Sequence, residues 1–358
     1  MKMKQFLAGV CAGLIFCLEG MAAAGAPADV PKDVKYILGF YYGNGENILI
    51  RENDGNLELL YRTLREDNCF ARANVFPLQK EHFDSYLMNE AGPITGSEAN
   101  VSFERDKDGY GITCKVGGHR YSRYFLGTGN GENALPFRFP AISDWENLRI
   151  DAEKAVMPTA LAAGTQAQLV NLATISGIKL ATISGIKLAS VYAGSDNCFG
   201  APLYQSPNMY LAAEAAAALE QVNKELNTWG YGIMVWDAYR PWAISKLAYL
   251  ALPDNKKFML EDPDLKGSVH NTGLAIDVSL FDLNTGEPVE MISGFDEPSM
   301  RQYSSYAGGT EKQRYLRCLL REIMEKHGFS GIEMEWWHFE YGDCSKYAHL
   351  NIPLESLR

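Results

Sequence analysis

Two histidines and one aspartate in the C-terminal half of the chain are of the residue types that bind zinc. His270 and Asp277 lie in the stretch Ser-Val-His-Asn-Thr-Gly-Leu-Ala-Ile-Asp, and His338 ends the later stretch Glu-Trp-Trp-His. Two imidazole nitrogens and one carboxylate oxygen can hold Zn²⁺ and leave a fourth position for water. Bound zinc lowers the pKa of that water toward neutrality. The three residues therefore predict a hydrolytic metal site, provided that the two stretches meet in the fold.

A carboxylate and a guanidinium could complete this chemistry. Glu335, three positions before His338, could take a proton from water and deliver it to a leaving amine. Positions three apart on a regular strand face opposite sides, so we expect the chain to leave strand geometry near Glu335. Arg240, in Asp-Ala-Tyr-Arg-Pro, could stabilise the oxyanion that develops when a carbonyl becomes tetrahedral. A surface ion pair is the alternative for Arg240.

Residue types and spacing leave a structural alternative open for the metal site as well. The two histidines could be core side chains, and Asp277 could belong to a turn. The alternation of apolar residues from Leu274 to Leu280 favours instead a strand that carries Asp277. Spacing alone does not show that the stretches converge.

The elements that would carry these residues are a mixture of helices and strands, from which we expect an α+β domain over residues 168–358. Alanine-rich and amphipathic stretches with proline before them or glycine after them predict the helices, and short β-branched or aromatic runs predict the strands. We expect helices from Ser206-Pro207 to about Leu226, at 242–252 and at 311–326, and strands at 232–236 and 332–341.

The N-terminal half has a different pattern. Short β-forming runs separated by Asp54-Gly55, Asp108-Gly109 and Gly117-Gly118 predict hairpins, and hence a small antiparallel β domain over residues 33–127. It resembles the lipocalin-like β modules that are appended to some secreted bacterial hydrolases. Residues 128–167 are expected to be a linker. The glycine-rich run 127–131, where the linker begins, lacks the spacing of a phosphate-binding loop.

The pattern Ser-x-His-x-x-Gly-x-Ala-x-Asp followed by Glu-x-Trp-His resembles the double signature of the LAS-type zinc D,D-peptidases, family M15. The segments Asp237–Pro241 and Gly294–Asp296 are similar to its D-alanyl-D-alanine dipeptidase branch, the VanX-like enzymes. The resemblance covers about residues 188–358. It implies a small antiparallel sheet flanked by helices, one zinc ion per chain, and a D,D-dipeptide as substrate.

The resemblance also implies roles for single residues. His270, Asp277 and His338 would be the zinc ligands, Glu335 the catalytic base and Arg240 the residue that stabilises the transition state. Ser268 and Asp296 would contact the dipeptide, with Asp296 receiving its ammonium group. The alternatives are a backbone hydrogen bond for Ser268 and a turn role for Asp296. Val269 departs from the family pattern, in which a second serine often stands there.

Two other functions stay open. A D,D-carboxypeptidase or endopeptidase that acts on peptidoglycan stem peptides would use the same metal chemistry but would not need an acid for a free ammonium group. A wall-binding module could keep a zinc site without turnover. Retention of Glu335 argues against the module, because loss of the base is the simplest route to an inactive relative.

Length and charge exclude other classes of function. The chain has 358 residues, which suggests about two domains. Its 44 acidic and 33 basic residues give a formal net charge of −11. A chain with this balance is repelled by phosphate backbones, so nucleic acid is not an expected partner.

The first residues have the pattern of a secretory signal peptide over residues 1–26. Two lysines precede an uncharged run from Phe6 to Leu18, and small residues follow at 22–26. The run is too short to span a membrane, so we expect an exported protein, periplasmic or secreted, with no membrane span. Lipoprotein anchoring through Cys17 is the alternative, although bulky Phe16 precedes it where a small residue is usual.

Five cysteines remain after Ala26, an odd number, so at least one has no partner within the chain. Their spacing assigns no disulfide and no thiolate zinc site. Residues 173–180 recur without change at 181–188, which indicates a recent duplication rather than a repeat architecture.

Overall fold

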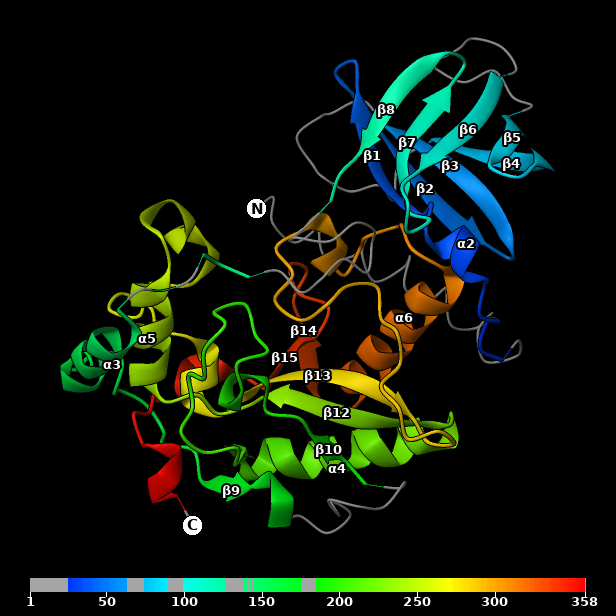
Figure 1. The fold of residues 1–358 in the computed structure, drawn as a ribbon. Coiled ribbons are helices and arrows are strands. Elements are labelled where there is room, and N and C mark those ends of the chain that lie inside the picture. The colour runs from blue at the N-terminus through cyan, green and yellow to red at the C-terminus, as the bar shows by residue number, and fades with distance from the viewer. Residues whose placement is uncertain are drawn as a thin grey trace, which may run out of the picture. The chain divides into compact units, whose positions relative to one another are not determined.

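The computed structural model describes residues 25–62, 74–88, 99–125, 138–140, 142, 144–174 and 185–357. Most of the signal-peptide pattern, Cys69, the run 127–131 and most of the duplicated segment lie outside these residues. The described chain forms two units (Figure 1). One comprises residues up to Tyr124 together with Ala307–Leu316, and the other comprises Phe125–Tyr306 and Arg317–Arg358 where they are described.

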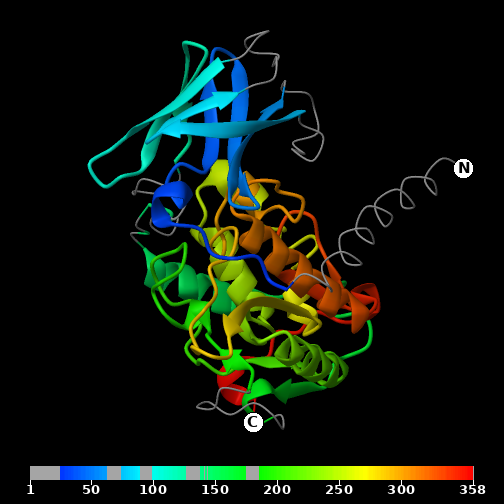
Figure 2. The same cartoon turned by 90° about the vertical axis from the view of Figure 1, so that its right-hand side faces the viewer.

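The first unit is a closed antiparallel barrel, drawn in blue to cyan in Figures 1 and 2. Each strand pairs with the next, and β1 pairs with β8 through Tyr41 opposite Arg123, which closes the barrel. Its strands are β1 (Gly39–Gly43), β2 (Glu46–Asn53), β3 (Asn56–Arg62), β4 (Asn74–His82), β5 (Ser85–Met88), β6 (Ala99–Arg105), β7 (Gly111–Val116) and β8 (His119–Arg123), preceded by the short helix α2 (Lys32–Lys35).

The antiparallel hairpins are confirmed, since Asp54-Gly55 joins β2 to β3 and Gly117-Gly118 joins β7 to β8. The small antiparallel β domain expected at 33–127 is corrected in its form, because the antiparallel sheet of the described residues closes into a barrel of eight strands. Apolar side chains fill its interior, among them Tyr41, Ile48 and Tyr121, all inaccessible to solvent.

This unit also contains a segment from far along the chain. Ala307–Leu316 includes the start of helix α6 (Glu311–Lys326). The backbone N–H of Glu52 donates to the Gly309 carbonyl at 3.1 Å, and the Glu52 carboxylate accepts from the Glu311 N–H at 2.8 Å. A carboxylate at a helix N-terminus satisfies an otherwise unpaired N–H and complements the helix dipole.

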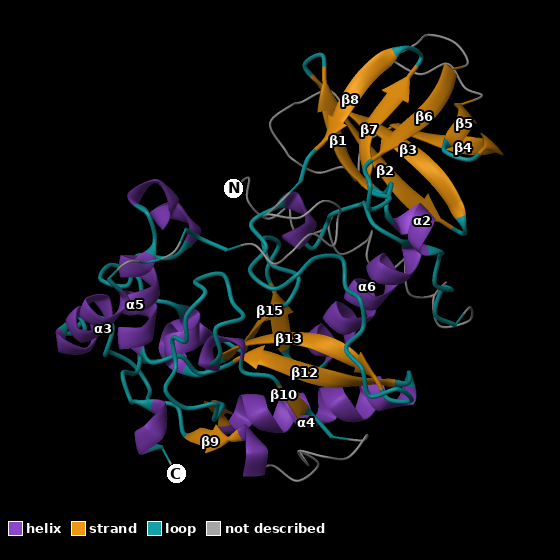
Figure 3. Ribbon diagram, viewed as in Figure 1, coloured by secondary structure: helices purple, strands orange, loops and turns teal. Residues whose placement is uncertain are grey.

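The second unit contains a five-stranded sheet in the order β10-β12-β13-β15-β14 (Figures 1 and 3). Strand β10 runs parallel to β12, and the other neighbours are antiparallel. Helix α4 packs against β12, and α3 packs against α5. The bounds are β10 (Lys187–Leu188), β12 (Tyr231–Asp237), β13 (Ala275–Asp282), β14 (Phe329–Gly331), β15 (His338–Tyr341), α3 (Trp145–Lys154), α4 (Ala213–Thr228) and α5 (Trp242–Ala251).

Short elements complete this unit. Strands β9 (Leu169–Asn171) and β11 (Tyr210–Ala212) form a separate antiparallel pair. The 3₁₀ turns are η2 (Leu172–Thr174), η3 (Val191–Ala193), η4 (Asp254–Met259), η5 (Val269–Thr272), η6 (Met300–Gln302), η7 (Cys344–Lys346) and η8 (Leu354–Ser356).

The helix at 311–326 is confirmed, and α5 and β12 agree with expectation to within one or two residues. The helix expected from Ser206-Pro207 is wrong at its start, because Tyr210–Ala212 pair with β9 before α4 begins at Ala213. The expected linker at 128–167 contains helix α3, whose Trp145 and Leu148 pack against the core of the second unit.

No helix among the described residues is long and apolar enough to cross a membrane. The described cysteines, Cys114, Cys198, Cys318 and Cys344, are free thiols.

Candidate metal centre and active site

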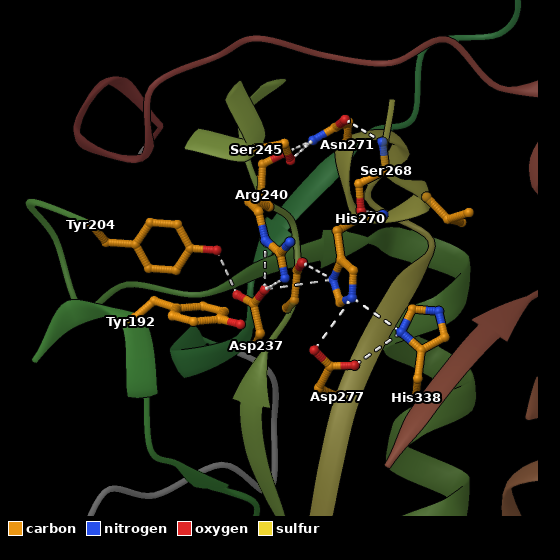
Figure 4. Close-up of polar contacts among 12 residues, drawn as sticks. Tyr192, Tyr204, Asp237, Arg240, Ser245, Ser268, His270, Asn271, Asp277 and His338 are labelled. Carbon is orange, nitrogen blue, oxygen red and sulfur yellow. Dashed lines mark hydrogen bonds and ion pairs between the residues drawn. The ribbon is translucent and has the colours of Figure 1, made fainter. Parts of the chain in front are cut away.

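The side chains of His270, Asp277 and His338 converge in the second unit (Figure 4). His270 Nε2 lies 3.2 Å from His338 Nδ1 and 3.3 Å from Asp277 Oδ2, and His338 Nδ1 lies 3.0 Å from Asp277 Oδ1. Donor atoms about 2.0–2.1 Å from a tetrahedral zinc ion lie about 3.3 Å from each other. The three donors therefore fit one small divalent cation in both spacing and chemical type.

Neighbouring strands place two of these residues. Asp277 on β13 lies opposite His338 on β15, and its partner on the other side is Asp237 on β12, where a bulge shifts the register after Val235. A bulge re-aims the side chains that follow it. The strand expected to carry Asp277 is thus confirmed.

A capped turn places His270. The hydroxyl of Ser268 accepts from the His270 N–H at 3.3 Å, and the Asn271 amide oxygen accepts from the Ser268 N–H at 2.9 Å. This reciprocal pair is a capping box at the start of η5. Gly273 ends the turn at φ 79°, a left-handed conformation that glycine adopts without strain. In this structure the Ser268 side chain therefore forms a backbone hydrogen bond, which was the alternative to a contact with the dipeptide.

A second contact orients the ring of His270. Its Nδ1 lies 2.7 Å from the Ala238 carbonyl oxygen and donates to it, which leaves Nε2 facing the shared point, where it could bind a metal. On the other imidazole, His338 Nε2 lies 3.5 Å from Glu340 Oε1, which leaves Nδ1 directed at the shared point.

The buried carboxylate of Asp277 remains ionised in this environment. Burial alone would raise its pKa, but His270 and His338 outweigh burial and hold the pKa of Asp277 well below its usual range. An ionised carboxylate beside two imidazoles is a donor set suited to zinc.

Glu335 lies in the loop before β15, outside regular strand geometry, and the strand expected at 332–341 is wrong at its start, because β15 begins only at His338. Its Oε2 is 3.9 Å from His338 Nδ1, the nitrogen that faces Asp277 and His270. Burial raises the pKa of Glu335, which moves the carboxylate toward the basicity that a general base needs near neutral pH.

Arg240 is buried rather than part of a surface ion pair. Its Nε and Nη2 donate to Asp237 Oδ2 at 3.0 and 2.6 Å, while Asp237 Oδ1 accepts from the Tyr204 hydroxyl at 2.6 Å. The Arg240 backbone N–H also donates to the His270 carbonyl at 3.1 Å, which ties the two segments together. The sequence alone assigns no role to Asp237 or Tyr204, although Asp237 stands in the same Asp-Ala-Tyr-Arg-Pro segment as Arg240.

Asp296 occupies a loop position with φ 54°, a left-handed conformation that aspartate tolerates better than most residues. Its Oδ2 accepts from the Tyr192 hydroxyl at 2.6 Å and lies 3.6 Å from Cys198 Sγ. Burial, aided by the charges of Glu335 and Asp277, raises the pKa of Asp296 to about 7. The sequence alone did not assign a role at this site to Tyr192 or to Cys198.

Aromatic rings surround this part of the unit. Trp336 and Trp337 are buried and pack against Trp236 and Phe295, with ring centroids 5.1 to 5.7 Å apart within the group.

Comparison with known proteins places these residues in a family. The Peptidase_M15 family model, described as D-ala-D-ala dipeptidase, matches residues 178–353, which include every candidate site residue. The D-alanyl-D-alanine dipeptidase of Escherichia coli K12 is 34% identical over 159 residues, or 44% of this chain and 80% of that protein. That of Enterococcus faecium is 32% identical over 169 residues, or 42% of this chain and 84% of that protein.

A solved structure of the LD-carboxypeptidase LdcB is 21% identical, with a TM-score of 0.26 over 37% of this chain and 59% of that chain. The chain belongs to the D-Ala-D-Ala dipeptidase family of M15 peptidases.

Proposed function

We propose that this protein hydrolyses the D-alanyl-D-alanine dipeptide to two D-alanines in a zinc-dependent reaction. The observation that carries the proposal is the cluster of His270, Asp277 and His338, with the carboxylate of Glu335 3.9 Å from a donor nitrogen of that cluster. The relatives named as D-alanyl-D-alanine dipeptidases suggest the substrate.

The cluster would hold zinc through His270 Nε2, Asp277 and His338 Nδ1. When bound there, zinc supplies a Lewis acid and lowers the pKa of a water molecule. Glu335 takes the proton of the attacking water at a carboxylate oxygen and delivers it to the nitrogen of the leaving D-alanine. Partial burial raises the pKa of Glu335, which favours the first transfer.

Two further charged residues would position the dipeptide. Arg240 presents a cation to the oxyanion that forms from the scissile carbonyl, and Asp237 holds that guanidinium in place. Asp296 pairs with the free ammonium group. Asp296 would then distinguish a free dipeptide, which carries an ammonium group on the carbon next to the scissile carbonyl, from the end of a longer peptide, which carries an amide there.

The test uses the purified mature protein with its zinc content measured per chain. It is incubated with D-Ala-D-Ala and, separately, with an amino-blocked D-Ala-D-Ala peptide, each with and without a chelator. We expect chelator-sensitive release of D-alanine from the free dipeptide alone. Cleavage of the blocked peptide would assign the protein to the D,D-carboxypeptidases, and zinc binding without cleavage of either would favour a binding module.

We further propose that the protein is exported and acts on dipeptides released during cell-wall turnover. The signal-peptide pattern over residues 1–26 supports export. Expression of the full chain, cell fractionation and N-terminal sequencing test it. A product that stays in the cytoplasm with residues 1–26 intact would contradict it.

A further inference from the structure

Tyr192 contacts both of the charged groups that the proposed reaction uses to position the dipeptide. Its hydroxyl donates to Asp296 Oδ2 at 2.6 Å. Its ring lies beneath the guanidinium of Arg240, whose Cζ is 5.2 Å from the ring centroid. A cation over an aromatic face is attracted to it, so one side chain holds an anion at its hydroxyl and a cation at its ring.

The position of Tyr192 is itself tightly fixed. The residue lies in η3 and is buried. Its carbonyl accepts from the N–H groups of Leu203 and Tyr204, at 2.8 and 3.0 Å. Its ring meets those of Tyr204 and Phe295 at centroid distances of 5.9 and 5.7 Å. A side chain held on this many sides transmits its position to whatever it binds.

The polar contacts form one continuous chain across the site. Tyr204 donates to Asp237, Asp237 holds Arg240, Arg240 lies over Tyr192, and Tyr192 donates to Asp296. The separation between the guanidinium and the Asp296 carboxylate is therefore set by a rigid aromatic ring.

We propose that Tyr192 is a specificity-determining positioning residue, which fixes Asp296 at the span from Arg240 that suits a free dipeptide. This inference rests on the proposed function. In a dipeptide a single carbon separates the ammonium group from the scissile carbonyl. Asp296 and Arg240 must therefore stay close and must not move independently. The substrate class selected in this way is dipeptides with an unblocked amino end.

Two substitutions separate the two contacts of Tyr192. Tyr192→Phe keeps the ring beneath Arg240 but removes the hydroxyl, so Asp296 loses its donor. We expect the KM for D-Ala-D-Ala to rise about tenfold or more, the usual effect of losing a hydrogen bond to a charged group, with kcat changed far less. The preference for the free over the amino-blocked dipeptide should fall by a similar factor. Tyr192→Leu removes both contacts, and kcat should fall as well.

Tyr210→Phe is the matched control. Tyr210 is buried, and its hydroxyl donates to the Leu357 carbonyl at 2.8 Å. This variant should leave KM, kcat and the preference unchanged. Unchanged KM and preference in Tyr192→Phe would overturn the inference, as would equal losses of kcat in Tyr192→Phe and Tyr192→Leu with no change in KM.

A second measurement does not depend on activity. ¹³C NMR of aspartate carboxyls, with Asp296 assigned through Asp296→Asn, gives the titration of Asp296 directly. Loss of the Tyr192 donor should raise the Asp296 pKa in Tyr192→Phe relative to the wild type and to Tyr210→Phe. Failure of the wild type to cleave D-Ala-D-Ala would refute the proposed function, whereas an unshifted titration would refute the role of Tyr192.

Discussion

Asp277 and His338 are direct partners across the β13–β15 pair, and their side chains approach to 3.0 Å. The two donors are thus placed by strand register. Because side chains alternate across a sheet, a slip of one residue would turn one of them to the opposite face. His270 reaches the same point from a turn outside the sheet.

Glu335→Ala should abolish dipeptide hydrolysis, because the variant retains the three metal donors but lacks the proton acceptor. We expect a loss of about 10²–10⁴-fold in kcat, with zinc content unchanged. D-alanine release and zinc per chain measure the two effects. Glu333→Gln is the control, since Glu333 is exposed in the same loop and accepts hydrogen bonds from Ser305. Undiminished activity in Glu335→Ala would refute the assignment of the base.

Removal of metal should inactivate the enzyme without unfolding it, because backbone pairing of β12, β13 and β15 does not depend on the ion. The far-UV circular dichroism of chelated protein should match that of the untreated protein, while its Tm falls. Zinc at a thousandfold its Kd should restore about 4 kcal/mol of stability. Asp277→Ala should abolish this zinc-dependent rise in Tm; a rise of wild-type size would show that Asp277 is not a ligand.

Asp237→Asn should destabilise the fold strongly, since it leaves the buried guanidinium of Arg240 without its anion. Breaking a buried pair by removing one partner costs about 3–5 kcal/mol. Urea unfolding of the variant and the wild type gives the difference. Asp264→Asn is the comparison, because Asp264 is exposed and its pair with Lys246 should contribute no more than about 1 kcal/mol. Equal losses in the two variants would contradict the importance of burial.

The pH dependence of kcat/KM should have an acidic limb near pH 7. Burial raises the pKa of Asp296 to about 7, so below that pH the carboxyl is neutral and cannot pair with the ammonium group. Activity on D-Ala-D-Ala should therefore fall as pH decreases through 7, and should fall again at high pH as the substrate amine loses its proton, near pH 8. In Asp296→Asn the limb near pH 7 should disappear. Its persistence would assign that limb to another group.

Ser268→Ala tests whether Ser268 acts on the turn or on the substrate. Loss of the cap should cost about 1 kcal/mol of stability and weaken zinc binding through His270. Competition with a chromogenic chelator measures the zinc affinity. A rise in KM with unchanged zinc affinity would show instead that the hydroxyl contacts the dipeptide.

The sequence was informative where chemistry and local pattern coincide. The sequence predicted a metal site from the residues around His270 and Asp277, and the structure brings the three metal-binding candidates together. It also predicted the strand that carries Asp277 and the departure from strand geometry at Glu335. Helix α6 was also foreseen, because its amphipathic period and the glycine after it are local signals.

Long-range contacts were beyond such reasoning. Barrel closure pairs Tyr41 with Arg123, and the Glu52 cap of α6 joins residues more than 250 positions apart. No local pattern encodes either contact. Tyr192 and Tyr204 were missed for the same reason, since a tyrosine in an apolar stretch has the same signature whether its hydroxyl meets a carboxylate or a backbone carbonyl.

Strand β10 is formed by Lys187–Leu188, the last two residues of the second copy of the duplicated octapeptide. At the level of the gene, loss of either copy yields the same protein, in which an identical Ile-Lys-Leu still precedes Ala189 and Ser190. Such a deletion would shorten the chain ahead of β10 and leave the residues that face β12 unchanged. The insertion is therefore reversible in a single genetic step, and natural length variants at this point would share one β10 sequence.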